Sequence, residues 1–159
     1  MPTKKLNGRL KFSVIRLAVS VLLCLPAGVA GSLFTAPAIS GWYQFLNRPA
    51  FAPPNWIFAP VWTTLYILMG VSLYLAWRRH ARLIWFWTQL VLNANWSLVF
   101  FGLRSPKLAL LNIIILWFSI IFTIKDFRHK SSPAAWLLVP YLVWVTFATY
   151  LNWSIMRLN

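Results

Sequence analysis

The fold follows from the segment Trp42–Met69, WYQFLNRPAFAPPNWIFAPVWTTLYILM. Its first half is rich in aromatic residues and proline, and its second half reads as a hydrophobic helix that begins at Trp56. Because proline has no N–H and leaves neighbouring backbone groups unpaired, the first half is incompatible with the lipid interior. We therefore expect it to lie at a membrane surface, as a lid or collar over a helical bundle.

The composition also indicates a membrane protein. Of the 159 residues, 60% are hydrophobic and only 10% are charged, whereas about a quarter of a soluble chain is charged. The net charge of +14 comes from 15 Lys and Arg against one acid, Asp126. In a soluble protein such a charge would suggest nucleic acid. Here the cations cluster at the ends of apolar segments, so the predicted partner is a lipid bilayer and no nucleic acid is expected.

Five apolar segments approach the roughly 20 residues that a membrane-spanning helix needs. They cover residues 17–36, 56–77, 83–103, 108–124 and 134–156, of which the fourth is short. The connections between the later segments are brief, so successive helices should be antiparallel neighbours. The predicted fold class is all-α: one domain over residues 1–159, an integral membrane bundle of five transmembrane helices, with residues 37–55 as the lid.

The Lys and Arg residues predict the orientation. Most of them lie before the first segment or in the connections after the second and fourth: Lys4, Lys5, Arg9, Lys11, Arg16, Arg78, Arg79, Arg82, Lys125, Arg128 and Lys130. The opposite side carries Arg48, Arg104, Lys107 and Arg157. The positive-inside rule then places the N-terminus in the cytoplasm and the C-terminus and lid on the other side. It does not distinguish an inner from an outer membrane.

The N-terminal segment has a second interpretation. A basic head, an apolar stretch and Gly28-Val29-Ala30 resemble a cleavable signal peptide. The apolar stretch continues through Phe34, which favours a retained first helix. Gly28 and Ser32, four residues apart, equally suit close helix packing.

The residues of common enzyme and metal sites are missing. Asp126 has no second carboxylate, His80 and His129 lie in basic connections, and there is no glycine-rich phosphate loop. Cys24 lies inside an apolar segment and reads as a small core residue. We therefore expect no metal and no required cofactor.

Polar and aromatic residues at membrane depth carry the functional signal instead. Gln89, Asn93 and Trp96 share one face of the third segment. Because amides are costly in lipid, this face should point inward, either to join helices through hydrogen bonds or to meet a ligand.

Two other helices present comparable faces. Trp144, Ala148 and Leu151 share a face of the fifth segment, one turn after Pro140, which should kink that helix. Trp62, Tyr66 and Met69 share a face of the second segment, after Pro60 in its first turn. Among the 11 tryptophans, those near segment ends suit an interfacial belt: Trp56, Trp77, Trp85, Trp87, Trp136 and Trp153. Trp62, Trp96, Trp117 and Trp144 lie deeper.

Together these faces predict a pocket lined by indoles and a few amides beneath the lid. Such a pocket suits a flat, largely apolar ligand, because aromatic faces stack and amides orient. A tetrapyrrole and a sterol both fit this description. Arg48 is the only cation of the lid.

Three ordered motifs resemble the translocator protein (TspO) family, whose animal members are also called peripheral-type benzodiazepine receptors. The first runs through Trp42-Tyr43, Leu46-Asn47-Arg48-Pro49, Pro53-Pro54, Trp56 and Pro60-Val61-Trp62-Thr63-Thr64-Leu65-Tyr66. The second contains Gln89-Leu90, Asn93, Trp96 and Phe100-Phe101-Gly102. The third runs through Val139-Pro140-Tyr141-Leu142-Val143-Trp144, Phe147-Ala148-Thr149, Leu151-Asn152 and Arg157-Leu158-Asn159.

The resemblance implies a five-helix bundle, usually a homodimer, with a ligand cavity beneath the first connection. It implies that porphyrins, haem, cholesterol or synthetic drugs bind there. The implied ligand-binding residues are Trp62, Tyr66, Asn93, Trp96, Trp144, Phe147, Ala148 and Leu151, with Trp42, Phe51 and Trp56 in the lid. It also implies a light-dependent breakdown of porphyrin, for which Trp62 and Trp144 are the catalytic candidates.

The chain departs from the family pattern at two places. Phe51 stands where relatives often have Trp, and Trp153 stands where the cholesterol motif of animal members has Tyr. The prediction is therefore a bacterial-type membrane receptor, sensor or carrier for tetrapyrroles such as protoporphyrin or haem. A porphyrin-degrading enzyme and a sterol or lipid transporter are the alternatives.

Overall fold

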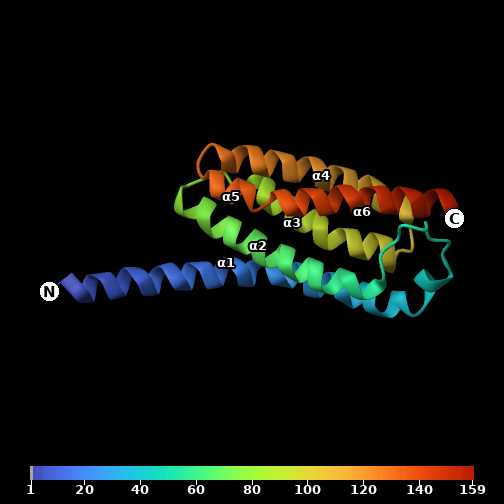
Figure 1. Ribbon diagram of the computed structural model, residues 1–159, viewed down its shortest axis with the longest axis horizontal. Helices are drawn as coiled ribbons and strands as arrows, with labels where there is room; N and C mark the ends of the chain where they lie inside the picture. Colours follow the sequence, from blue (N-terminus) through green and yellow to red (C-terminus); the bar gives the residue numbers. More distant parts are fainter. Residues whose placement is uncertain (1) are drawn as a thin grey trace.

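The computed structural model describes the backbone from Pro2 to Asn159 and the side chains from Ser13 onward. All regular structure in this part of the chain is helical. The longest elements lie along one axis, with the start of α1 at one end and the end of α6 at the other (Figure 1). The elements are α1 (Pro2–Ile39), η1 (Trp42–Phe45), η2 (Asn55–Ile57), α2 (Phe58–Arg78), α3 (Ile84–Ser97), η3 (Leu98–Gly102), α4 (Pro106–Arg128), α5 (Ser132–Trp136) and α6 (Val139–Leu158).

The predicted membrane bundle is confirmed. Within residues 13–159, four helices are long and apolar enough to cross a membrane: Ser13–Ile39, Asn55–Arg78, Pro106–Arg128 and Ser132–Leu158. The fifth predicted helix is α3, which has 14 residues and continues directly into η3. The second predicted helix starts as η2, and Pro60 lies in the first turn of α2 as expected.

Helix α1 is longer than its apolar segment. It continues to Ile39, so the predicted lid loses residues 37–39 and the connection to α2 begins at Ser40. Pro37 does not end the helix, although a proline removes one backbone hydrogen bond inside a helix. The aromatic, proline-rich connection then forms two short 3-10 turns, η1 and η2.

The third predicted helix changes its winding before its end. The Leu103 N–H donates to the carbonyl of Leu98, five residues earlier, at 2.8 Å. Residues 98–102 are therefore π-helical, a winding that is rare and concentrated at functional sites. Hydrophobic periodicity alone does not distinguish this turn from an α-helical one.

The sequence predicts a short fourth helix over residues 108–124, and this prediction is wrong. Pro106 occupies its first turn, the Ser105 hydroxyl accepts a hydrogen bond from the Leu108 N–H, and α4 extends to Arg128 for a length of 23 residues. A serine cap followed by proline is a strong helix start. The charged residues after Ile124 continue the helix beyond the apolar segment.

The fifth predicted helix is interrupted instead of kinked. α5 ends at Trp136, and α6 begins at Val139 with Pro140 in its first turn. Pro140 has no N–H to donate to the carbonyl of Trp136, and its ring would clash there, so the helix restarts.

Close packing of α1 against α2 depends on glycine. A Cβ on Gly70 would overlap the backbone of Val21, and a Cβ on Gly28 would overlap the Tyr66 ring. Small residues of this kind let helix backbones approach each other in membranes. The expectation that Gly28 suits helix packing is therefore confirmed.

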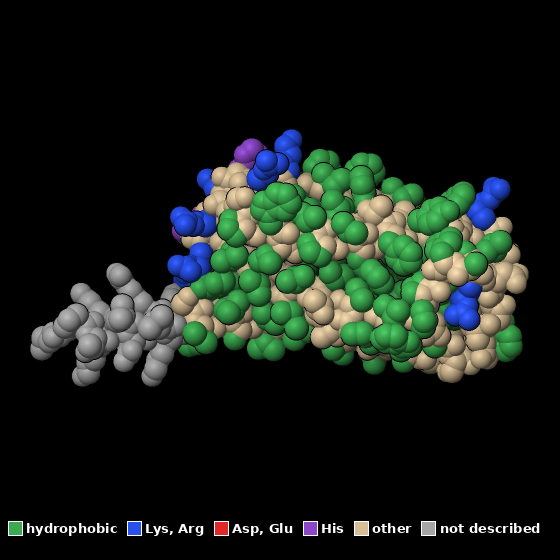
Figure 2. Space-filling model, in the orientation of Figure 1, with side chains coloured by type: hydrophobic (Ala, Val, Ile, Leu, Met, Phe, Trp, Pro, Cys, Tyr) green, Lys and Arg blue, Asp and Glu red, His purple; other side chains and the backbone are tan. Residues whose placement is uncertain are grey.

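The charges are distributed as predicted. Figure 2 shows Lys, Arg and His side chains gathered at the end of the bundle that holds the α2–α3 and α4–α5 connections, with fewer cations at the opposite end. The apolar surface between the two ends fits a lipid environment.

Candidate ligand-binding cavity

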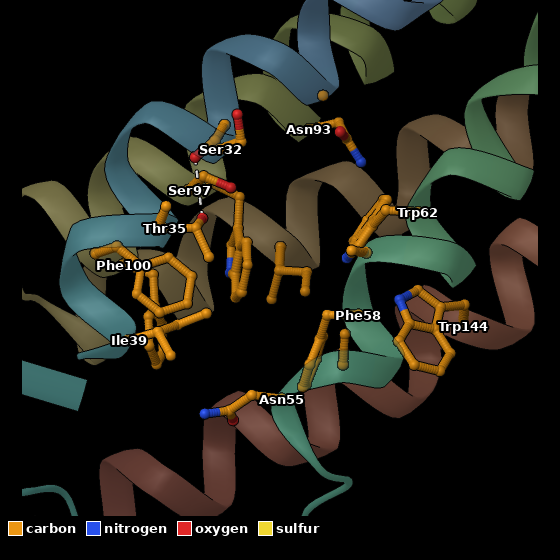
Figure 3. A pocket seen from close by; sticks show the side chains of 18 of the residues that line it. Ser32, Thr35, Ile39, Asn55, Phe58, Trp62, Asn93, Ser97, Phe100 and Trp144 are labelled. Carbon is orange, nitrogen blue, oxygen red and sulfur yellow. Dashed lines mark hydrogen bonds between the residues drawn. The ribbon is translucent and has the colours of Figure 1, made fainter. Parts of the chain in front are cut away.

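A cavity of about 460 Å³ lies between α1, α2, α3, η3, α4 and α6, towards the end of the bundle that carries the lid. Figure 3 shows Ser32, Thr35 and Ile39 of α1 on one side of it and Trp62, Trp144 and Phe58 on the other. Asn93 lies at one end of the cavity and Asn55, from the lid, at the opposite end. Its volume falls within the range of small-molecule pockets in proteins.

Three helices meet through Asn93 at the inner end of the cavity. The Tyr66 hydroxyl donates to Asn93 Oδ1 at 2.5 Å, and Asn93 Nδ2 donates to the Tyr141 hydroxyl at 3.0 Å. These bonds join α2, α3 and α6, and Asn93 also lines the cavity. Of the two roles that the sequence left open for this amide, the joining of helices is therefore confirmed, and the same side chain lies in the cavity lining.

Trp96 is held in a fixed orientation on the cavity wall. Its Nε1–H donates to Asn152 Oδ1 at 3.0 Å, and Asn152 Nδ2 donates to the carbonyl of Pro106 at 2.8 Å. The indole also stacks on Phe100, with ring centroids 5.1 Å apart and planes inclined by 28°. Because its polar atom is already bonded, Trp96 offers mainly an aromatic face to the cavity.

The π-helical turn brings two consecutive aromatic residues to the cavity. Phe100 and Phe101 both line it, although neighbouring residues of an α-helix point about 100° apart. Their rings pack edge to face at 4.8 Å. The wider turn of η3 thus adds a second aromatic ring to the wall.

Trp144 presents an unused hydrogen-bond donor. Its Nε1 is buried and has no partner among the described residues, and its indole packs edge to face against Phe58 at 6.0 Å. Trp62, on the same side of the cavity in Figure 3, stacks on Tyr66 at 5.7 Å. A buried N–H without an acceptor is unfavourable.

The lid closes the other end of the cavity. Tyr43 and Asn55 line the cavity there, Arg48 Nη1 donates to Asn55 Oδ1 at 3.4 Å, and the Arg48 guanidinium lies 5.5 Å from the Tyr43 ring centre. Burial raises the pKa of Tyr43, with Arg48 opposing the shift, so the phenol stays neutral at physiological pH.

The lid is also tied to the end of α6. The Asn47 N–H donates to Asn159 Oδ1 at 3.0 Å, and Asn159 Nδ2 donates to the Asn47 carbonyl at 3.1 Å.

The wall between α1 and α2 is thin. Val29 lines the cavity although 61% of its surface is exposed on the outside of the bundle. Ala36, Ala59 and Thr63 likewise line the cavity and are exposed. Small side chains on this seam separate the cavity from the surface that would face lipid.

The structure brings most of the predicted site residues together. Seven of them line the cavity: Trp62, Tyr66, Asn93, Trp96, Trp144, Ala148 and Leu151. Phe147 lies outside the lining, where it packs against Trp144 at 5.5 Å.

The three named lid residues do not line the cavity. Trp42 packs edge to face on Phe100 at 5.9 Å, Phe51 stacks on Tyr150 at 5.0 Å, and Trp56 is 72% exposed.

Three other residues that the sequence places at membrane depth lie outside the cavity lining. Met69 is fully buried in the core. The Trp117 Nε1–H donates to the Thr146 hydroxyl at 2.8 Å, which joins α4 to α6. Gln89 is buried, and neither polar atom of its side chain has a partner among the described residues.

Sequence reasoning missed the contribution of α1. Eight of its residues line the cavity: Leu25, Gly28, Val29, Gly31, Ser32, Thr35, Ala36 and Ile39. The available signal was the spacing of Gly28, Ser32 and Ala36 at intervals of four, which places small residues on one helix face.

The fold and the cavity together define a class of protein. The chain is a multi-pass helical membrane protein with an internal aromatic cavity, and the described residues contain no group of three or more His, Cys, Asp or Glu side chains able to hold a metal ion. The sequence profile of the TspO/MBR family matches residues 20–158.

Individual relatives agree with that profile. The chain is 44% identical over 153 residues to the tryptophan-rich protein TspO of Chlorobaculum tepidum, covering 92% of this chain and 97% of the relative. It is also 44% identical over 155 residues to the tryptophan-rich protein TspO of Archaeoglobus fulgidus, covering 92% and 99%. The translocator protein of Ovis aries is 35% identical over 142 residues, covering 84% of each chain. The chain therefore belongs to the TspO/MBR family of membrane sensors and translocators.

Proposed function

We propose that this protein binds a tetrapyrrole in the cavity and acts as a membrane receptor, sensor or carrier for it. The observation that carries the proposal is the buried Nε1–H of Trp144, which has no partner among the described residues, in a lining that holds seven other aromatic residues. A flat conjugated ring stacks on such a wall, and an acceptor on that ring would satisfy the indole donor.

The charge near the lid supports the same ligand class. Arg48 is exposed and bonded to Asn55, which lines the cavity. A guanidinium there would pair with the propionate groups of a protoporphyrin or haem, because arginine binds carboxylates with two parallel N–H donors. A sterol has no carboxylate and would not use this cation.

The route of the ligand follows from the thin seam between α1 and α2. A hydrophobic ligand partitions into the bilayer, and the small exposed residues Val29, Ala59 and Thr63 separate that bilayer from the cavity. Entry from the membrane is therefore part of the proposal.

The test is saturable quenching of tryptophan fluorescence by protoporphyrin IX in the dark. Trp144→Phe should weaken the affinity by roughly three- to tenfold, the value of one hydrogen bond. Trp153→Phe is the matched control, since Trp153 is 44% exposed and lies outside the cavity lining. Equal affinities of wild type and Trp144→Phe would reject the pocket assignment, and displacement of the pigment by cholesterol at the same site would favour a sterol transporter.

A light-dependent porphyrin-degrading activity is the second candidate. It is favoured by the position of two indoles, Trp62 and Trp144, on one side of the cavity that would hold the pigment (Figure 3). Illumination of the complex in air should then bleach the porphyrin absorbance faster than in free pigment, and Trp62→Phe should slow the bleaching. Bleaching at the rate of free pigment would leave binding as the function.

A further inference from the structure

A second groove, of about 210 Å³, lies at the lid end of the bundle, outside the main cavity. Its walls come from α1, from the residues around the start of η1, from η3 and from Arg104. The lining residues are Leu33, Phe34, Pro37, Ala38, Gly41, Trp42, Phe101, Gly102 and Arg104. Phe101 lines both the groove and the main cavity.

The walls of the groove are apolar and open to the surroundings. Leu33 is 69% exposed and Phe34 is 37% exposed. Gly102 lets η3 approach α1, because a Cβ there would press on the side chains of Leu98 and Phe34. In a membrane, exposed apolar walls of this kind are covered by acyl chains.

Arg104 is the one charged side chain of the groove. It makes no hydrogen bond, ion pair or aromatic contact with any other residue in the described part of the chain. Its φ of 51° is left-handed, a conformation that a residue with a long side chain rarely adopts. Such conformations persist where the surroundings impose them and cluster at binding sites.

Trp42 adds an interfacial side chain next to this cation. Its ring is held edge to face on Phe100, and it lines the groove together with Arg104. Tryptophan and arginine together are typical of the depth at which lipid headgroups begin. The groove thus presents apolar walls, an indole and an unpaired guanidinium to one ligand.

We propose that this groove binds one anionic glycerophospholipid. An acyl chain lies along Leu33, Phe34 and Phe101, and the phosphate accepts hydrogen bonds from Arg104. Charge complementarity selects this occupant, because an unpaired guanidinium is matched by a phosphate and two parallel N–H donors fit its oxygens.

The experiment uses the full-length protein in nanodiscs of equal parts phosphatidylglycerol and phosphatidylcholine, followed by native mass spectrometry of the lipids retained. Wild type should keep phosphatidylglycerol in preference. Arg104→Asn should reduce its retention by about fivefold, the effect of one arginine at a charged bilayer surface, and asparagine tolerates a positive φ. Lys107→Gln is the matched control, since Lys107 is exposed and does not line the groove.

A second variant tests the contribution of the apolar walls of the groove to lipid binding. Ala38→Phe should fill the groove and lower retention of both lipids, without any change of charge.

If Arg104→Asn does not fold, Arg104→Gly removes the same cation and fits the backbone conformation. Unchanged phosphatidylglycerol retention in the folded Arg104 variant would overturn the proposal, and so would an equal loss in Lys107→Gln. The readout contains no tetrapyrrole, so its failure would not affect the proposed function.

Discussion

The bonds through Asn93 join α2, α3 and α6 beside the cavity, and they should contribute to stability as well as to shape. Tyr66→Phe removes the donor at 2.5 Å and leaves Asn93 Oδ1 without a partner at a buried position. We expect a loss of about 1–2 kcal/mol in the free energy of unfolding, because an unsatisfied buried amide is unfavourable. Unfolding in mixed micelles measures it.

Tyr150→Phe is the control for that substitution. Tyr150 is 55% exposed and its hydroxyl has no partner among the described residues. Its removal should change stability by less than about 0.5 kcal/mol. Equal effects of the two substitutions would show that the Tyr66–Asn93 bond is not a stabilising contact.

Arg48 should distinguish ligands that carry carboxylates from those that do not. Arg48→Gln should weaken protoporphyrin IX binding by about five- to tenfold, while the dimethyl ester of the same pigment should bind both proteins equally. Arg157→Gln is the matched control, because Arg157 is also an exposed cation near the lid end but, unlike Arg48, its side chain bonds to no described residue of the cavity lining. Equal losses for acid and ester would remove Arg48 from headgroup recognition.

Single residues differ in how far the sequence predicts them. The inward position of Asn93 and Trp96 follows from the cost of polar groups in lipid, and the structure confirms it. The free Nε1–H of Trp144 does not follow, because it depends on which acceptors the other helices bring near. Trp117 illustrates the difference: it lies as deep in its segment as Trp144, but Thr146 satisfies its indole.

The packing of α1 against α2 is sensitive to the addition of a single Cβ atom. Gly70→Ala places a Cβ against the backbone of Val21, which cannot move without shifting the helix. We expect destabilisation of about 1–3 kcal/mol, the cost of overpacking. Thermal unfolding in detergent measures it.

Gly102→Ala gives the comparison, because its Cβ would meet only the side-chain ends of Leu98 and Phe34. Those ends can shift by small rotations, so this variant should lose less stability than Gly70→Ala. The reverse order would mean that α1 and α2 do not pack as closely as the contact at Val21 indicates.

The helices were predictable in number and type, but not in their irregularities. The length of a hydrophobic stretch identifies an apolar segment, but it does not show where the helix within that segment changes its winding or breaks. The π-helical turn of η3 and the break between α5 and α6 arise from backbone hydrogen bonds and from Pro140 acting on its preceding turn. The greater length of α4 comes from the Ser105 cap and from charged residues that hydropathy excludes.

The cavity as a whole is a product of the arrangement of elements. The sequence predicts aromatic faces on three segments, whereas the structure adds residues of α1, η3 and α4 to the walls. Small residues such as Gly31 and Ala36 carry no chemical signature of a ligand site, so only the folded structure places them in the cavity lining.

The charge asymmetry of the whole bundle predicts its orientation in the membrane. The basic end holds the α2–α3 and α4–α5 connections, and the lid lies at the other end (Figures 1 and 2). The positive-inside rule places the basic end in the cytoplasm. Single cysteines provide a test in a Cys24→Ala background: Cys24 is fully buried, and its removal leaves one reactive thiol per variant.

Ser40→Cys lies at the lid end and Ser132→Cys at the basic end, and both positions are exposed. In sealed vesicles whose outer face is the outer face of the cell, a membrane-impermeant maleimide should label Ser40→Cys directly. It should label Ser132→Cys only after detergent opens the vesicles. The opposite pattern would contradict the orientation, and would place the lid on the cytoplasmic side.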